Sequence, residues 1–492
     1  MRRTALLLAV MVTAVLVAFS GVALAQQTDR TTSDREQQSS NGGQAPLHKP
    51  SDELKPGRYI VVLKDNADSR RVANEHARQH GAQVDLVYEH ALNGYAAQLS
   101  DAALERVRGD QNVLFVEHDS KVRALDHSSS QYLDKGVDRI VGNESSTISG
   151  NHSGSVDSVG VAVIDSGISK SHSSTTDANK ELNVKGGISY INWTTSTNWD
   201  DGNGHGTHVA GTIGARDNNG GIVGMAPAVP LYAVKVLGTD GSGYTSWIIK
   251  GIDWVTANAV SKNIKVANMS IGGSVTDDHA SCATTQDSYK KAICKSVTPD
   301  PTKNYPGVTY VVAAGNSNKN LATSRPAAWE DYDSNGAKPL VLTVTAVADS
   351  DGNPGGTWGA SCRTDEEDTN ANFSNYAVED TDKKHTIAAP GVCIKSTWKS
   401  GAYNTISGTS MATPHVAGTA ALCISTSATN GGKCTGGPSD VMADLLADAG
   451  EQPASYGYAQ DPYQVTDSSK PYYGYMTRAG GPSPSPGAYY LY

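Results

Sequence analysis

Residues 57–125 combine strand-like and helix-like hydrophobic patterns in the order β-α-β-β-α-β. The strand-like runs are 59–63, 82–88, 92–99 and 113–116, and the helix-like stretches are 67–79 and 101–107. This order is typical of the split βαβ arrangement. We therefore predict a small α+β domain of the ferredoxin-like kind, with no cluster of candidate catalytic residues inside it.

The pattern changes in residues 128–478, where longer helices alternate with runs that are apolar on both faces. The apolar runs are 159–164, 231–237, 264–271, 308–314 and 340–347, and the helical stretches are 205–215, 245–259 and 410–424. Strands buried on both faces indicate a mostly parallel sheet covered by helices. We predict one three-layer α/β domain, closed by a strand at 473–477 and followed by a flexible tail at 479–492.

The first 25 residues have the features of a secretory signal peptide. Arg2 and Arg3 precede an apolar run of residues 5–19, and Ala23 and Ala25 form the small-x-small pattern of a cleavage site. A membrane anchor is the alternative, but the run is short for a span of about 20 residues. Residues 26–56 are polar and predict a disordered linker.

Composition agrees with an exported globular protein. The 492 residues carry a net charge of −10, which argues against nucleic acid or an anionic membrane as the main partner. An even number of cysteines in an exported chain suggests disulfides, although six cysteines allow 15 pairings and buried free thiols remain an alternative. Pairing by adjacency gives Cys282–Cys294, Cys362–Cys393 and Cys423–Cys434.

Two motifs place polar groups at the ends of predicted elements. The run 159–164 ends in Asp165, and functional groups gather at the carboxyl ends of parallel strands, although many α/β folds end a strand in Asp. His205 begins a helical stretch between two glycines, which indicates close approach of the backbone. A metal pair with His208 is the alternative. Because the H-E-x-x-H pattern is absent, we expect His208 to be a core histidine.

Two further motifs carry an amide and a hydroxyl. Asn316 follows the run 308–314, where its amide could donate to a developing oxyanion or serve only in a turn. Ser410 begins a helical stretch after a glycine, among the unpaired N–H groups of a first turn. Pro414 is expected in that same turn, where its missing N–H has no partner. Taken alone, Ser410 could equally be a helix N-cap.

In combination, these motifs closely resemble those of the subtilisin-like serine proteases, or subtilases. They are D-S-G-I at 165–168, H-G-T-H-V-A-G at 205–211 and G-T-S-M-A-T-P-H-V-A-G at 408–418. The order Asp, His, Ser differs from that of chymotrypsin-like and α/β-hydrolase enzymes. The resemblance implies that Ser410 is the nucleophile, His205 its base and Asp165 the orienting carboxylate. Asn316 and the Ser410 N–H would form the oxyanion hole, and the chemistry would need no cofactor.

The resemblance also implies a cleft that pairs with an extended substrate from both sides. The implied substrate-binding residues are Gly241, Ser242, Gly243, Ser270, Ile271, Gly272, Ala313, Ala314 and Gly315. The primary pocket would have small apolar walls, which predicts broad specificity with large apolar residues favoured. A segment similar to the family's calcium loop offers Asp217, Asn218 and Asn219 as oxygen ligands of a structural calcium ion, with a solvated turn as the alternative.

Residues 57–125 resemble subtilase propeptides, which act as intramolecular chaperone and inhibitor. The exit segment 121–125 would lie in the cleft, and self-cleavage would fall near 125–128. Relative to the family, residues 277–306 are an insertion that carries Cys282 and Cys294, and we expect a surface loop there.

The sequence therefore predicts a secreted, monomeric serine endopeptidase whose partners are protein substrates and its own propeptide. An inactive, binding-only subtilase would need a lost active-site residue, and all four positions are present. A nucleotide-binding protein would show G-x-G-x-x-G after its first strand, which is absent. The alternative interpretation as a structural wall protein would be supported by the Tyr-rich C-terminal region alone. Because His205 must be neutral to accept a proton, activity should persist at alkaline pH.

Overall fold

The computed structural model describes residues 44–50, 54–124, 127–128, 136–140, 155–156, 158–173, 180–218, 221–275, 279–333, 336–349, 351–354, 362–425, 434–462 and 470–479. Residues 46–492 form one compact unit. The predicted signal peptide and all but one residue of the predicted tail lie outside the described residues. Among those that are described, no helix has the length and hydropathy needed to cross a bilayer.

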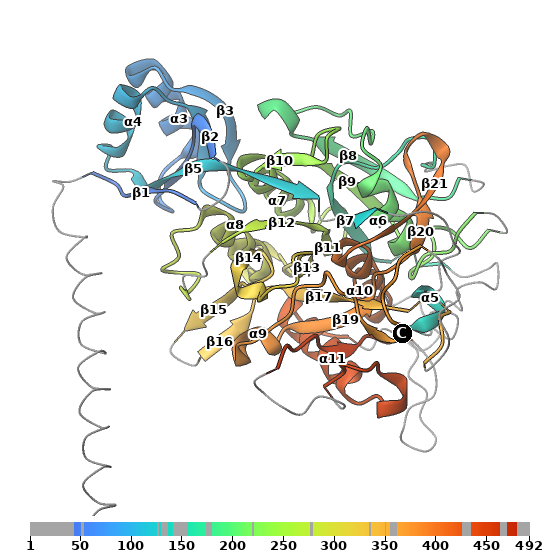
Figure 1. Ribbon diagram of the computed structural model, residues 1–492. Coiled ribbons are helices and arrows are strands. Elements are labelled where there is room, and N and C mark those ends of the chain that lie inside the picture. The colour runs from blue at the N-terminus through green and yellow to red at the C-terminus, as the bar shows by residue number, and fades with distance from the viewer. Residues whose placement is uncertain are drawn as a thin grey trace, which may run out of the picture. The chain divides into compact units, whose positions relative to one another are not determined.

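The N-terminal domain, residues 54–124, has the predicted order β-α-β-β-α-β. Its elements are β2 (Leu54–Leu63), α3 (Ser69–His80), β3 (Gln83–Tyr88), β4 (Gly94–Gln98), α4 (Asp101–Arg108) and β5 (Val113–Ala124), blue to cyan in Figure 1. The strands pair antiparallel in the order β5-β2-β4-β3. Asp68 and Ser100 start the two helices, because each side chain accepts the N–H three residues later. The predicted order of elements is confirmed.

Strand β5 is much longer than the four residues predicted for it. It continues to Ala124 because β10 (Ser242–Tyr244) and β12 (Ile271–Ser274), more than a hundred residues away in the sequence, pair with its second half. A short strand β1 (Leu47–His48) also pairs with β5, inside the region predicted as a disordered linker. These partners come from outside the local sequence, so a local pattern could not predict them.

The large domain is built on a nine-stranded, mostly parallel sheet, as predicted. Its main order is β22-β19-β17-β13-β11-β7-β9-β8, all parallel, and β18 pairs antiparallel with β17. The strands are β7 (Gly160–Asp165), β8 (Val184–Ser189), β9 (Leu231–Lys235), β11 (Ile264–Met269), β13 (Thr309–Ala313), β17 (Leu342–Ala348), β18 (Thr369–Asn370), β19 (Thr386–Pro390) and β22 (Tyr475–Met476). Strands β8 and β19 were not predicted, because glycine and alanine give them little hydrophobic signal.

Helices cover both faces of this sheet and make it the middle of three layers. Along β7, Val161 and Val163 face one hydrophobic core, and Ala162 and Ile164 face the other. The first core contains α6 (His205–Gly214), α10 (Thr409–Ile424) and α11 (Pro438–Gly450), and the second contains α7 (Thr245–Asn258) and α8 (Ser288–Val297). Both faces of the sheet are therefore buried away from solvent, which explains the continuous apolar runs in the sequence.

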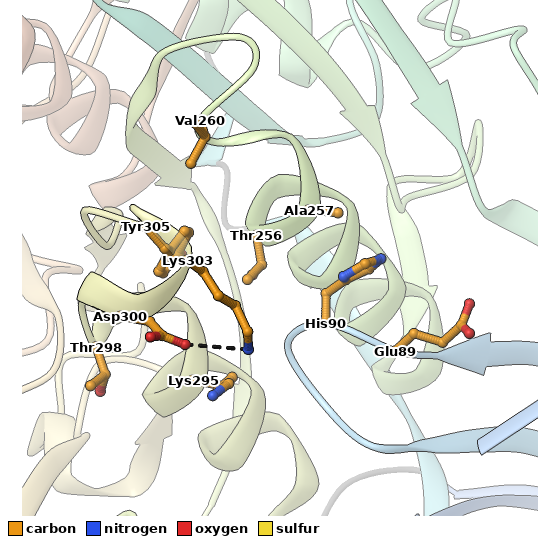
Figure 2. A pocket seen from close by; sticks show the side chains of 10 residues that line it. All are labelled: Glu89, His90, Thr256, Ala257, Val260, Lys295, Thr298, Asp300, Lys303 and Tyr305. Atoms are coloured by element: carbon orange, nitrogen blue, oxygen red, sulfur yellow. Dashed lines mark ion pairs between the residues drawn. The ribbon is translucent and has the colours of Figure 1, made fainter. Parts of the chain in front are cut away.

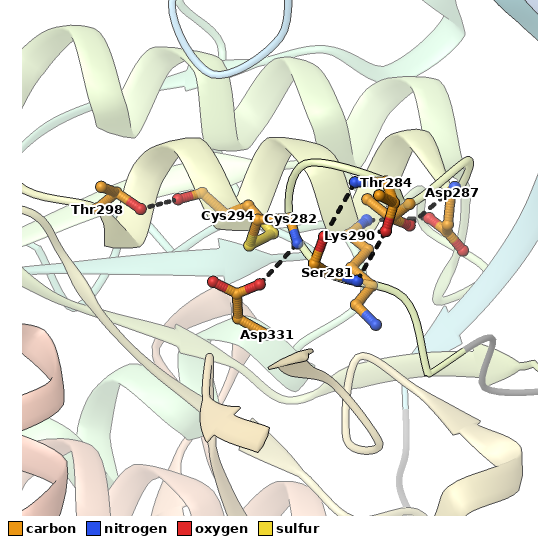
Figure 3. The surroundings of a disulfide bond; sticks show 9 residues. Ser281, Cys282, Thr284, Asp287, Lys290, Cys294, Thr298 and Asp331 are labelled. Carbon is orange, nitrogen blue, oxygen red and sulfur yellow. Dashed lines mark hydrogen bonds between the residues drawn. A yellow bond between two sulfur atoms is a disulfide. The ribbon is translucent and has the colours of Figure 1, made fainter. Parts of the chain in front are cut away.

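The insertion 277–306 differs from the surface loop that we expected. It contains α8, most of whose residues are buried, and Asp287 caps that helix by accepting from the N–H groups of Tyr289 and Lys290. Cys282 is bonded to Cys294 on α8, as Figure 3 shows. The other two disulfides, Cys362–Cys393 and Cys423–Cys434, also have the pairing expected from adjacency.

Candidate active site

The carboxyl end of β7 brings an aspartate into contact with a histidine. Asp165 Oδ1 lies 2.8 Å from His205 Nδ1, and both side chains are fully buried. The same carboxylate oxygen accepts the Ser166 backbone N–H at 2.6 Å. A carboxylate at Nδ1 fixes the imidazole tautomer that carries its proton there, so Nε2 has the lone pair that a general base needs.

An aspartate that the sequence analysis missed fixes the helix that begins at His205. Helix α6 has Gly204 at its N-cap, which offers no side-chain acceptor. Instead, Asp201 accepts the Gly204 N–H at 2.9 Å with Oδ1, and the Thr207 N–H and hydroxyl at 2.9 and 2.6 Å with Oδ2. An Asp just before a helix start is a recognisable N-capping signal, and it could have been read from the sequence.

Ser166 joins the two motifs directly. Its hydroxyl donates to Asp201 Oδ1 at 2.9 Å and accepts the Gly206 N–H at 2.9 Å. Gly206 also has to be glycine, because a Cβ atom there would lie 2.3 Å from the Gly167 carbonyl oxygen. The glycine after His205 therefore permits the close approach of α6 to the end of β7 that the sequence pattern indicated.

Asn316 presents a buried amide donor whose orientation is set by its neighbours. Its Oδ1 accepts from the Thr409 N–H at 2.9 Å and from the Thr409 hydroxyl at 2.8 Å. Its Nδ2 is buried and makes no hydrogen bond within the described part of the chain. Gly315, at φ +106°, makes the turn before it, and Asn375 Nδ2 would lie 2.5 Å from a Cβ atom at that position. A buried N–H without a partner is costly and suits an incoming oxyanion.

Ser410 lies in the first turn of α10, which packs against α6 in the same core. Its hydroxyl donates to the Ser270 carbonyl at 3.0 Å, and the Ser270 hydroxyl donates to the Ser410 carbonyl at 2.8 Å. Our explanation of Pro414 was wrong: it is the sixth residue of the helix. It therefore cannot donate to the carbonyl of Ser410, and Ser270 satisfies that oxygen instead.

Four of the residues predicted to bind substrate, Ser242, Gly243, Ile271 and Gly272, lie on the strands that pair with β5. Strand β5 runs antiparallel to both β10 and β12 and lies between them. Gly243 is opposite Val122, and Ile271 is opposite Ala124. Ser270 precedes β12, Ala313 ends β13, and Ala314 and Gly315 follow it at the carboxyl edge of the sheet. The large domain thus holds an extended chain by β-augmentation, with main-chain pairing on both sides.

Carboxylates secure the N-terminal domain outside this cleft. Asp119 accepts the Ser246 N–H at 2.9 Å, and Glu117 accepts the Ser288 N–H at 2.8 Å, so each lies at the start of a large-domain helix. From the other side, Asp253 Oδ1 accepts three successive N–H groups, those of residues 89–91, at 2.6–3.2 Å. Burial, together with a smaller contribution from the nearby Asp287, raises the pKa of Glu117 to about 8.

The cavity between the two domains is not the catalytic cleft. It has a volume of about 450 Å³, and it is lined by Glu89 and His90 and by the C-terminal ends of α7 and α8 with the segments that follow them (Figure 2). None of Asp165, His205 and Ser410 lines it. The cavity is therefore a consequence of docking.

His208 behaves as the predicted core histidine. It is fully buried, and Nε2 donates to the Ile394 carbonyl at 3.0 Å. Burial lowers its pKa to about 3. A second buried histidine, His385, lies 3.2 Å from Glu330 and 3.8 Å from Asp382. Burial lowers the pKa of His385, but hydrogen bonds donated to these two carboxylates and their charge outweigh it and raise the pKa to about 9. The imidazolium therefore provides the cation of that cluster.

The predicted calcium loop is described in part. Asp217 is buried, and the carboxylate of Glu181, also buried, lies against the same loop, where it accepts from the Ile222 N–H and the Tyr403 hydroxyl. Asn218 is partly exposed, and Asn219 lies outside the described residues. An all-oxygen set with two carboxylates fits the preferences of calcium.

Comparison with known proteins identifies the family of both domains. The Subtilase family profile matches residues 157–459, and the Peptidase inhibitor I9 profile matches residues 58–125. Subtilisin NAT of Bacillus subtilis subsp. natto is 35% identical over 370 residues, covering 75% of this chain and 80% of its own. The extracellular serine proteinase of Thermus sp. (strain Rt41A) is 37% identical over 392 residues, with the same coverage of both chains.

A solved structure of a cold adapted subtilisin-like serine proteinase covers 70% of this chain and 98% of its own, with 28% identity and a TM-score of 0.45. The family profile spans more than half of the chain, and the curated relatives match over most of their own lengths. The chain therefore belongs to the subtilase family of serine-type endopeptidases and carries an inhibitor-type propeptide domain before its catalytic domain.

Proposed function

We propose that this subtilase hydrolyses peptide bonds through an acyl-enzyme on Ser410, with His205 as general base and Asp165 as the carboxylate that orients it. The observation that carries the proposal is the buried 2.8 Å contact between Asp165 Oδ1 and His205 Nδ1. It supports a neutral imidazole with its lone pair on Nε2, in a core shared with the helix of Ser410.

In acylation, one proton passes from Ser410 to His205 and then to the leaving amine. Ser410 Oγ attacks the peptide carbonyl carbon while its proton passes to His205 Nε2, and the carbonyl oxygen becomes an oxyanion. Asn316 Nδ2 and the Ser410 N–H donate to that oxyanion. When the C–N bond breaks, His205 returns the proton to the leaving amine. A water molecule repeats the sequence on the ester, which releases the acid and restores the Ser410 hydroxyl.

We further propose broad specificity with large apolar residues favoured next to the cleaved bond. The support is the composition of the predicted pocket walls, 270–273 and 313–315, which contain small and apolar residues and no acid. An acidic floor would be needed to select Arg or Lys there. Cleavage of a peptide library tests this, and a strict requirement for Arg or Lys at that position would contradict it.

The precursor is proposed to be exported and to mature by its own activity. Residues 1–25 have the pattern of a signal peptide. Strand β5 places residues 121–124 between the two edges of the cleft, immediately before the segment 125–128 where we expect self-cleavage. Cleavage there would convert β5 into a product-like strand that still occupies the cleft, which explains inhibition by the released domain.

A structural calcium ion is proposed for the loop 216–221. Asp217, Asn218 and Glu181 would hold it, and it would stabilise the loop without taking part in the chemistry. We expect chelation by EGTA to lower the unfolding midpoint of the full chain by several degrees and added calcium to restore it, as measured by calorimetry. Unchanged unfolding after chelation would instead support a loop held by its own hydrogen bonds.

The catalytic proposal is tested by replacing the nucleophile. Ser410→Ala should lower kcat by about 10⁴-fold or more and should accumulate as the unprocessed precursor. Mass spectrometry of the purified protein and a serine-directed phosphonate label report the two effects separately. Normal processing of Ser410→Ala would refute self-cleavage, and labelling of that variant at the same rate would refute the nucleophile.

A further inference from the structure

Two aromatic side chains of the large domain form a platform beside the cleft. Trp193 and Tyr244 are stacked, with ring centroids 5.0 Å apart and planes inclined by 28°. Trp247 lies edge-on to both and buttresses the pair from behind. The Trp193 Nε1–H is shared between the Ser246 hydroxyl at 3.1 Å and Asp119 Oδ2 of the N-terminal domain at 3.3 Å. Within the large domain, Trp247 and Ser246 therefore hold the platform, and Asp119 contributes while the N-terminal domain is docked.

The N-terminal domain covers this platform with positive charge. The Arg58 guanidinium lies 4.0 Å from the centroid of the Trp193 ring. The Lys55 ammonium lies 5.7 Å from the Trp193 ring and 5.5 Å from the Tyr244 ring. A cation within about 6 Å of an aromatic face is attracted by the ring quadrupole, so two cations make three cation–π contacts with one aromatic pair.

A third cation comes from the strand that lies in the cleft. Lys121 of β5 is directly opposite Tyr244, three residues before Ala124, which faces Ile271. The exposed carboxylate of Asp240 lies nearby, and its pKa is below the ordinary value, first because the Ser242 hydroxyl donates to it and also because of the charge of Lys121. The cleft strand thus pairs with the platform residue Tyr244, and the charge of Lys121 acts on Asp240.

All three cations belong to the N-terminal domain, which departs in the proposed maturation. The aromatic platform and Asp240 belong to the large domain and remain. We propose that in the mature enzyme Trp193, Tyr244 and Asp240 form a subsite that binds a lysine or arginine side chain of the protein substrate. That side chain would lie at or beside the substrate residue that pairs with Tyr244, several residues before the cleaved bond. This inference rests on the proposed function and adds a second specificity element to the apolar preference next to the cleaved bond.

A peptide series on the mature enzyme, obtained by self-processing of the full chain, tests the subsite. The parent peptide has glutamine at every position from three to eight residues before the cleaved bond, and each derivative has one lysine. We expect kcat/KM to rise about three- to tenfold, mainly through KM, at one or two adjacent positions, and glutamate there to lower it. A flat profile with a well-cleaved parent peptide would overturn the subsite and leave the proposed function intact.

Two variants assign the effect to the platform. The readout is the ratio of kcat/KM between the best lysine peptide and its glutamine parent. Trp193→Leu and the exposed Asp240→Asn should each move this ratio toward one, and the second keeps the test valid if the first folds poorly. Trp254→Leu is the matched control, because Trp254 forms a separate cation–π pair with Lys262. An unchanged ratio in both Trp193→Leu and Asp240→Asn would overturn the proposal.

Discussion

The catalytic edge and the docking surface of the N-terminal domain both place carboxylates against backbone N–H groups, but the two regions differ in where the carboxylates come from. At the edge, Asp201 and the helix that it caps belong to the same domain. At the docking surface, Asp119 and Glu117 come from the propeptide domain and cap helices of the catalytic domain. The cap that Asp201 forms is therefore permanent. At the docking surface, water can take the place of Asp119 and Glu117 at the helix starts.

The oxyanion donor should show the largest effect at the catalytic edge. Asn316→Ala removes the buried Nδ2 donor, and we expect kcat to fall by about 10²–10³-fold with little change in KM, because the lost bond forms only in the transition state. Steady-state kinetics on one peptide measure this. Ser317→Ala, at the exposed neighbouring residue, is the control. Equal losses of kcat and substrate binding in Asn316→Ala would point to a structural role.

The cap of α6 should show a smaller effect on the same edge. Asp201→Asn replaces Oδ2 of the carboxylate with an NH₂ group, which cannot accept from Thr207. The start of α6 and the His205 ring should therefore shift. We expect kcat to fall by about 10–100-fold. Asp200→Asn, at the adjacent exposed carboxylate, should retain activity within about twofold. A wild-type kcat in Asp201→Asn would show that the edge holds its geometry without this cap.

At the docking surface the effects should be smallest and should depend on pH. The docked pKa of Glu117, about 8, lies above its ordinary value of 4.5. Its contribution to docking is therefore fully present below about pH 4.5 and is lost as pH rises to about 8. In the Ser410→Ala precursor, which stays intact, Glu117→Gln should flatten the fall of the unfolding midpoint between pH 5 and 8.

The neighbouring cap provides the matched comparison for that experiment. Asp119→Ala should lower precursor stability by about 1 kcal/mol, the usual cost of losing an N-cap. Burial raises the pKa of Asp119 from an ordinary value of 3.8, so this variant should change the pH dependence from a lower pH than Glu117→Gln does. Calorimetry across the pH range separates the two variants. An identical pH profile in Glu117→Gln and in the Ser410→Ala parent would show that docking does not involve protonation of Glu117.

The sequence determined the parts of this protein that depend on short-range order. The β-α-β-β-α-β order of the N-terminal domain, the parallel sheet and the starts of α6 and α10 follow from periodicity and helix-start signals within a few residues. The positions of Asp165, His205, Asn316 and Ser410 followed from motifs at the ends of those elements. The fixed period of a helix or strand makes such features visible in a window of ten to twenty residues.

Tertiary structure decided everything that needs a partner distant in the sequence. The length of β5 depends on β10 and β12, the tolerance of Pro414 depends on the Ser270 hydroxyl, and the insertion contains a buried helix, α8. The cationic cover of the Trp193 platform is likewise a contact between two domains. Hydrogen bonds and burial are satisfied by whichever group lies nearby in space, so only the folded chain reveals which group that is.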